Sequence, residues 1–176
     1  MHLVAVPLVA LALVAAAPAA ADGVDPMNET PEQLRKGIEN AHPATCYLLA
    51  QKLFAAGDKE EATFWFYAGQ LRFRFHLAAN PGLDASGDPA LFASLNEVVG
   101  RPINEYAFGG QRALVATLDR VLAWDETTPN GFTSKRDHAA AWKRIRDGLG
   151  EMRRYVVENG DSIRAQRTAN GLENRD

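Results

Sequence analysis

Apolar residues recur at intervals of three and four along most of this chain, and no segment alternates apolar and polar residues over the length of a strand. Such spacing places apolar side chains on one face of a helix. Prolines, glycines and capping residues divide the pattern into about six helices, at 30–40, 42–57, 58–79, 88–100, 110–125 and 134–160. Residues 101–106 read as irregular or as one short turn. The chain is therefore predicted to be an all-α helical bundle.

The helix predicted at 58–79 is apolar on nearly all sides. Its large apolar residues surround the helical wheel, at Phe64, Trp65, Phe66, Tyr67, Leu71, Phe73 and Phe75. One narrow polar stripe remains, at Glu60, Thr63, Tyr67, Gln70 and Arg74. A helix with this pattern is typical of the centre of a bundle, with neighbours packed around it. Asp58 predicts its N-cap, and Gly57 the end of the helix before it.

The last predicted helix is long and carries a heptad seam. The seam residues are Trp142, Ile145, Leu149, Met152 and Val156. A seam of this length favours packing against the rest of the bundle over a coiled-coil dimer, so we expect a monomer. Ser134 predicts the N-cap of this helix, and Gly160 predicts a bend or a break. The all-α domain is predicted to span 30–164, with 165–176 as a polar tail.

The N-terminus has the pattern of a secretory signal. The first 21 residues contain no Lys, Arg, Asp or Glu, and Leu3 to Ala17 form an apolar run with one proline. This run is shorter than the ~20 residues of a membrane span and is followed by the small residues Ala19, Ala20 and Ala21. We therefore predict a signal peptide at 1–21, a mobile leader at 22–29 and a periplasmic or secreted protein. No stable membrane span is expected after cleavage.

Composition narrows the function classes further. Hydrophobic residues make up 47% of the chain and charged residues 23%, which excludes a mainly disordered protein. The net charge of −3 gives no general attraction to nucleic acid, although basic residues outnumber acidic ones after residue 134. A single cysteine excludes a disulfide framework or a cysteine zinc cluster within one chain. Cys46 stands among apolar neighbours and is predicted to be a buried apolar residue.

Residues 46–75 resemble one helical hairpin of the tetratricopeptide and Sel1-like repeat families. The resemblance rests on small and apolar residues at the positions typical of these families, at Leu49, Ala50, Leu53, Ala62 and Phe66. The segment 57–62 resembles the turn of such a repeat. Cys46, Leu53 and Arg74 depart from the pattern, because Trp, Tyr and Pro are typical at their positions. The resemblance implies a helix–turn–helix unit and, through it, a peptide-binding role.

Polar residues of the central helix are the candidates for binding. A buried arginine needs a carboxylate partner, and the candidates for that partner are Glu97, Glu105 and Asp119. One hypothesis is a structural ion pair that fixes the helix register. The other is an anion pocket built from Arg74, Gln70 and Tyr67, with Asn104 and Glu105 beside it. The candidate binding surface comprises Tyr67, Gln70, Arg72, Arg74, His76, Asn104 and Glu105.

Motifs that carry enzyme or metal chemistry are missing from the sequence. It contains neither a serine nucleophile elbow nor the two-histidine zinc motif. Asp84, Ser86 and Asp88 match the first ligand positions of a calcium loop, but Pro89 replaces the glycine that the loop needs. Asp88 is therefore predicted to cap a helix. No enzyme activity and no cofactor or metal site is predicted.

Together these patterns predict an exported helical protein that binds another protein or a peptide. An inhibitor, immunity or scaffold role would suit a small exported helical protein. The alternative is a small-ligand binder or an enzyme that uses an aromatic and arginine pocket around Tyr67, Arg74 and His76.

Overall fold

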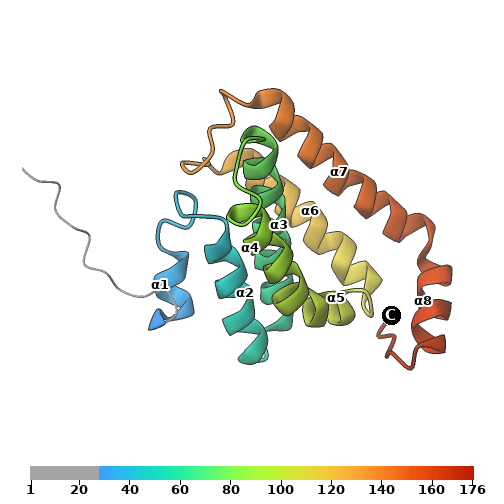
Figure 1. Cartoon of the computed structure of the whole chain (residues 1–176). Helices are drawn as coiled ribbons and strands as arrows, with labels where there is room; N and C mark the ends of the chain where they lie inside the picture. Colours follow the sequence, from blue (N-terminus) through green and yellow to red (C-terminus); the bar gives the residue numbers. More distant parts are fainter. Residues whose placement is uncertain (1–27) are drawn as a thin grey trace, which may run out of the picture.

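The structure is a computed structural model that describes residues 28–176, and these residues form an all-helical bundle (Figure 1). The all-α prediction is therefore confirmed. The predicted signal peptide and most of the predicted leader lie outside the described residues. The elements in chain order are α1 (Pro31–Arg35), α2 (Ala44–Ala55), α3 (Lys59–Ala79), α4 (Asp88–Leu95), the π-helix η2 (Asn96–Gly100), α5 (Arg101–Ala107), α6 (Gln111–Thr127), α7 (Ala139–Glu158) and α8 (Gly160–Ala169).

Helix α3 lies at the centre of the bundle, as its apolar surface predicts. It packs against α2 on one side and against α5, α6 and α7 on the others (Figure 1). Phe66, Tyr67 and Phe73 are each at most 1% exposed. Because neighbours surround α3, both its polar stripe and its opposite face meet other helices. The chemistry of its few polar residues is therefore decided by tertiary contacts.

Local sequence signals set the starts and ends of the first three helices. The side chain of Thr30 accepts a hydrogen bond from the backbone of Gln33, whose own side chain bonds back to Thr30, so the predicted capping box is present. Asp58 caps α3 as predicted by accepting from the backbone N–H of Glu61. Gly57 has a φ of 90° in the turn between α2 and α3, a conformation that side chains with a Cβ disfavour.

The α2–α3 hairpin packs very closely at one point. A Cβ on Gly69 would lie 2.8 Å from the Cβ of Cys46 and 3.0 Å from the ring of Tyr47, so only glycine lets α3 approach α2 this closely. Cys46 is 1% exposed, and burial raises the pKa of its thiol to about 12. The prediction of a buried apolar cysteine is therefore confirmed.

Three local predictions are wrong. Residues 101–106 are helical and belong to α5, whose first turn holds Pro102 and which continues directly from η2. Asp88 does not cap α4, because Gly87 is the N-cap residue and the Asp88 carboxylate contacts histidines. Ser134 caps the turn before α7 through the N–H of Asp137, and α7 itself begins at Ala139.

The heptad seam of α7 faces the bundle as predicted, but only part of it is fully buried. Leu149 and Val156 lie in the core, whereas Ile145 and Met152 are half-buried and pack against it. Trp142 is also half-buried. The chain breaks at Asn159, beside the predicted position, and continues as α8 to Ala169, past the expected domain end at residue 164. The final residues return to the α5–α6 turn, where the backbone N–H of Arg175 donates to the carbonyl of Gly109 at 2.6 Å. Within residues 28–176, no helix combines the length and hydropathy that a bilayer span requires.

Two glycine substitutions are expected to change stability in opposite directions. A Cβ on Gly100 would lie 2.8 Å from the buried ring of Phe66, so Gly100→Ala should cost about 1–3 kcal/mol through overpacking. A Cβ on Gly150, inside α7, would meet nothing within 4 Å. Gly150→Ala should therefore stabilise the protein by about 0.5–1 kcal/mol, since alanine is the better helix former. Urea unfolding followed by circular dichroism measures both, and equal shifts would contradict the close α3–η2 approach.

Candidate functional site

The polar stripe of α3 joins the central helix to η2 and α5. Tyr67 is 1% exposed, and its hydroxyl donates to the side-chain oxygen of Asn104 at 2.7 Å. Gln70 donates through Nε2 to the side-chain oxygen of Asn96 at 2.9 Å. The spacing of three and four residues places Tyr67, Gln70 and Arg74 on one face, as predicted. The first two are used inside the protein, whereas Arg74 is exposed.

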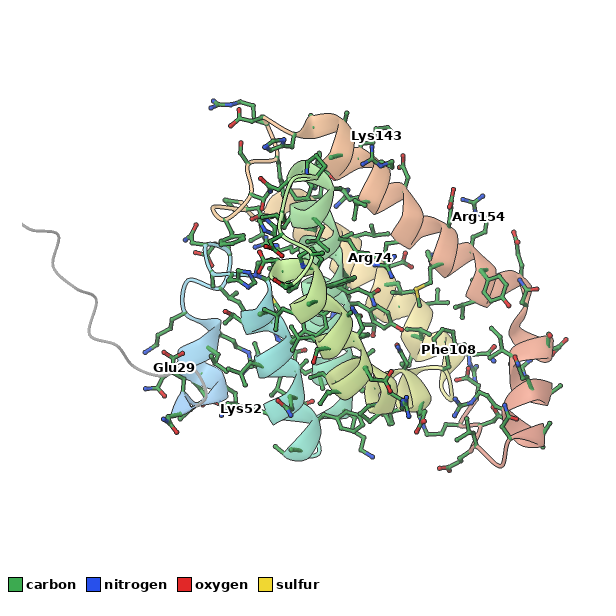
Figure 2. All side chains as sticks on the ribbon, in the orientation of Figure 1. Glu29, Lys52, Arg74, Phe108, Lys143 and Arg154 are labelled. Carbon is green, nitrogen blue, oxygen red and sulfur yellow. The ribbon has the colours of Figure 1, made fainter. Side chains whose placement is uncertain are left out.

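Arg74 lines a small cavity between α3 and α7, which we call the Arg74 cavity. Its volume is about 140 Å³, and its lining residues are Gln70, Leu71, Arg74, Arg144, Ile145, Gly148, Leu149 and Met152. None of these residues is acidic. Neither Arg74 nor Arg144 forms an ion pair within residues 28–176. The Arg74 guanidinium carbon lies 5.9 Å from the ring centroid of Phe92. Figure 2 shows Arg74 between the ribbons of α4 and α7. Two arginines therefore line this cavity, and neither has an ion-pair partner among residues 28–176.

A second cavity lies between η2–α5 and α7–α8, and we call it the Arg167 cavity. Its volume is about 500 Å³, and its lining residues are Asn96, Glu97, Arg101, Asn104, Glu105, Phe108, Tyr155, Ile163, Gln166, Arg167 and Asn170. The two cavities are neighbours, because Gln70 of the first is hydrogen-bonded to Asn96 of the second. Asn104 and Glu105, the predicted neighbours of the anion pocket, line this second cavity.

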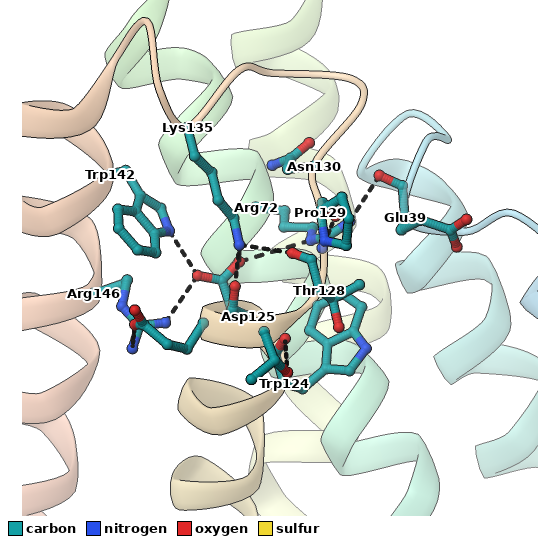
Figure 3. A network of polar contacts seen from close by, with 12 residues as sticks. Glu39, Arg72, Trp124, Asp125, Thr128, Pro129, Asn130, Lys135, Trp142 and Arg146 are labelled. Atoms are coloured by element: carbon teal, nitrogen blue, oxygen red, sulfur yellow. Dashed lines mark hydrogen bonds and ion pairs between the residues drawn. The ribbon is translucent and has the colours of Figure 1, made fainter.

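Arg72 belongs to a buried network on another side of α3 (Figure 3). Its Nη1 donates to the carbonyl of Glu39 at 3.1 Å and its Nη2 to that of Pro129 at 2.8 Å. Its guanidinium carbon lies 4.1 Å from the ring centroid of Trp124, and its Nε lies 3.8 Å from the Asp125 carboxylate. Arg72 is 2% exposed and therefore structural.

The prediction of the carboxylate partner for a buried arginine is wrong. Asp125 is the partner of Arg72, whereas Glu97, Glu105 and Asp119 do not contact Arg72. The Asp125 carboxylate also accepts from Nε1 of Trp142 at 2.8 Å and from Nη1 of Arg146 at 2.9 Å. This network fixes the segment between α6 and α7 and the start of α7 against the central helix.

His76 belongs to a separate polar cluster, whose residues line neither of the two cavities. Its Nε2 lies 2.9 Å from the Asp88 carboxylate, whose other oxygen is 3.3 Å from Nε2 of His42. The Nδ1 of His76 lies 3.2 Å from the hydroxyl of Thr133. Thr133 is 5% exposed, so this hydroxyl–imidazole–carboxylate row is closed to a substrate and instead holds α4 onto α3. Within residues 28–176, no group of histidine, cysteine and acidic side chains is arranged to hold a metal ion.

The seven residues of the predicted surface therefore lie in five different places. Gln70 and Arg74 line the Arg74 cavity, and Asn104 and Glu105 line the Arg167 cavity. Tyr67 is a buried link between α3 and α5. Arg72 and His76 belong to the two structural clusters. Sequence reasoning missed Arg144 and Arg167, because nothing in the local pattern shows that α7 and α8 bring them to cavities.

Comparison with known proteins finds no match to a family model, to a curated protein or to a solved structure. The resemblance of residues 46–75 to a tetratricopeptide or Sel1-like hairpin therefore stays a prediction.

Proposed function

We propose that this protein is exported and binds another protein or a peptide, placing a carboxylate of the partner in the Arg74 cavity. The observation that carries the proposal is the pair of arginines, Arg74 and Arg144, that line one cavity with no acidic residue among its lining. The predicted signal peptide would bring the protein to the periplasm or the cell exterior, where such a partner would be met.

The charge arrangement favours an anionic group of limited size. An arginine binds a carboxylate through two parallel N–H donors, and hydrogen bonds to charged groups contribute about 1.5–3 kcal/mol each. A cavity of about 140 Å³ is smaller than the ~300–1,000 Å³ of typical small-molecule pockets. It fits one carboxylate of a larger partner better than a whole ligand.

Exposed apolar residues near the cavities support a macromolecular partner. Val98 on η2 is 63% exposed and Tyr155 on α7 is 56% exposed, and these two elements flank the Arg167 cavity. Interface cores are enriched in aromatic residues and arginine and are surrounded by a polar rim. A partner held by its carboxylate at Arg74 could cover these side chains as well.

The alternative small-ligand or enzyme site has weaker support. Tyr67 and His76 are separated by about two and a half turns at 3.6 residues per turn, which places them on opposite sides of α3. Tyr67 bonds Asn104, whereas His76 bonds Asp88 and Thr133. Of the three residues, only Arg74 lines one of the two cavities.

Substitution of the two arginines should abolish partner binding without unfolding the protein. The partner is first captured from the periplasmic or secreted fraction of the producing cell, with this protein as the bait. The affinity of the captured partner for each variant is then measured. We expect the double variant Arg74→Gln, Arg144→Gln to bind at least tenfold more weakly, because losing one charged hydrogen bond costs about 1.4 kcal/mol or more. The melting temperature should change little, since both side chains are exposed.

The matched control is Arg154→Gln. Arg154 lies on the same helix as Arg144, is exposed and forms no ion pair within residues 28–176, but it does not line the Arg74 cavity (Figure 2). This variant should bind as the natural protein does. Equal weakening by the control and the double variant would indicate a general charge effect and reject the Arg74 cavity as the binding site.

A further inference from the structure

Two arginines in the described part of the chain are buried, and only one of them has a counter-ion. Arg72 lies beside Asp125 and also donates to two carbonyls. Arg167 is 8% exposed, and no carboxylate lies within ion-pair distance of it. Its Nη2 donates to the carbonyl of Glu173 at 2.6 Å, and its Nε has no hydrogen-bond partner. An unpaired buried charge is costly, so this arginine is suited to an anion that comes from outside the chain.

A second guanidinium group strengthens the positive charge at this point. A Cβ on Gly109 would lie 2.8 Å from Nη2 of Arg167 and 2.9 Å from Nη1 of Arg175, so both groups converge beside that glycine. Arg175 is held there by stacking on Tyr106 and by a hydrogen bond to the Tyr106 carbonyl at 2.6 Å. Burial lowers the pKa of Arg167, and the charge of Arg175 lowers it further.

The cavity that Arg167 lines has the size and composition of a ligand pocket. Its volume of about 500 Å³ lies within the usual range for small molecules. The amide side chains of Asn104, Gln166 and Asn170 can donate hydrogen bonds, and apolar surface comes from Phe108, Tyr155 and Ile163. This combination suits a molecule with one polar end and an apolar body.

Acidic residues in the lining restrict the charge of that molecule. Glu97 is paired with Arg101 and lies on the exposed rim. Glu105 is exposed on α5 and forms no ion pair with Arg167. Its negative charge nevertheless raises the pKa of Arg167, against the larger lowering effect of burial. Like charges repel at short range, so these carboxylates disfavour phosphate and polyanions more than a single carboxylate.

We propose that the Arg167 cavity binds a small organic monocarboxylate with an apolar body, using the Arg167 guanidinium as the counter-ion. Asn104, Gln166 and Asn170 complete the polar end of the site, and Phe108 and Ile163 contact the apolar body. This proposal does not depend on the proposed partner site. It rests on the unpaired Arg167 and not on the Arg74 cavity.

The test uses the full chain with phenylacetate as the probe and phenylacetamide as its uncharged counterpart. We expect phenylacetate to bind saturably in the millimolar range by calorimetry and to shift the Nε–H resonance of Arg167. Phenylacetamide and inorganic phosphate should bind at least tenfold more weakly. Absence of a saturable phenylacetate signal, or equal binding of the amide, would overturn the proposal.

Three variants place the binding at Arg167. Arg167→Gln should weaken phenylacetate binding at least tenfold, whereas Arg164→Gln, also on α8 but paired with Asp161 and outside this cavity, should leave it unchanged. Asn170→Asp would introduce a carboxylate into the lining, and we expect it to compete with phenylacetate and to raise the melting temperature. This last variant keeps Arg167 in place, so it tests the site even if Arg167→Gln fails to fold. Unchanged binding in both Arg167→Gln and Asn170→Asp would reject the site.

Discussion

Asp125→Asn is expected to destabilise the protein by about 3–5 kcal/mol, because breaking a buried ion pair leaves its partners uncompensated. Asp125 is 2% exposed, and three cations surround it (Figure 3): Arg72 at 3.8 Å, Lys135 at 3.7 Å and Arg146 at 2.9 Å. Asparagine has nearly the same shape but no charge, and its amide nitrogen adds a donor where only acceptors are needed. Urea unfolding at neutral pH measures the loss against a total stability of ~5–15 kcal/mol.

The same substitution on the exposed side of α6 provides the control. Asp119 lies on that helix, is 50% exposed and pairs with Arg153 at 2.6 Å. The hydrogen bond from Arg153 lowers the pKa of the Asp119 carboxyl, but exposed pairs contribute little to stability. Asp119→Asn should therefore lose only a small part of what Asp125→Asn loses. Equal midpoints for the two variants would mean that the buried network does not stabilise the fold.

Short-range signals explain how much of the fold could be predicted. Capping by Thr30 and Asp58 depends on residues three positions away, and the glycine turn at Gly57 depends on its own backbone. The apolar surface of α3 predicts a central helix because each side must meet a neighbour. The sequence does not predict the π-helix η2, whose last residue, Gly100, lies against the ring of Phe66 in the folded protein.

Long-range pairing explains what the sequence could not predict. Asp125 stands at the predicted end of a helix, where a carboxylate usually faces solvent. In the folded protein, side chains distant in sequence contact it, among them Arg72 of α3 and Trp142 and Arg146 of α7. Asp88 stands at a helix start, where capping is the common role, yet α3 and the segment before α2 bring His76 and His42 to it. Composition and spacing identify candidate polar residues but not their partners.

The candidate site shows the same limit. The three- and four-residue spacing of α3 correctly places Gln70 and Arg74 on one face, because that spacing is a local property of the helix. The partner of Arg74 across the cavity, Arg144, comes from α7 and depends on the angle at which α7 crosses α3. Arg167 is buried beside Gly109 and the C-terminal residues, and the local sequence of α8 does not show these long-range contacts.

A chain that ends at Gly148 is expected to lose its fold, whereas one that ends at Asp161 should keep it. The shorter chain lacks Leu149, Met152 and Val156, and each buried side chain of this size contributes an estimated ~1.5–3 kcal/mol. Their sum approaches the whole stability of a small domain. The longer chain keeps all three and loses α8, whose single buried residue is the unpaired Arg167.

Circular dichroism and thermal melting of the two fragments test this difference, and two neighbouring valines refine it. Val156 is 1% exposed and Val157 is 59% exposed, so Val156→Ala should lower the melting temperature by several degrees, whereas Val157→Ala should leave it nearly unchanged. Both substitutions remove the same atoms from adjacent positions of α7, so helix propensity cannot explain a difference between them. A Gly148 fragment that melts like the full chain would show that α7 is dispensable for the bundle. In that case the wall that carries Arg144 would not be a fixed part of the Arg74 cavity.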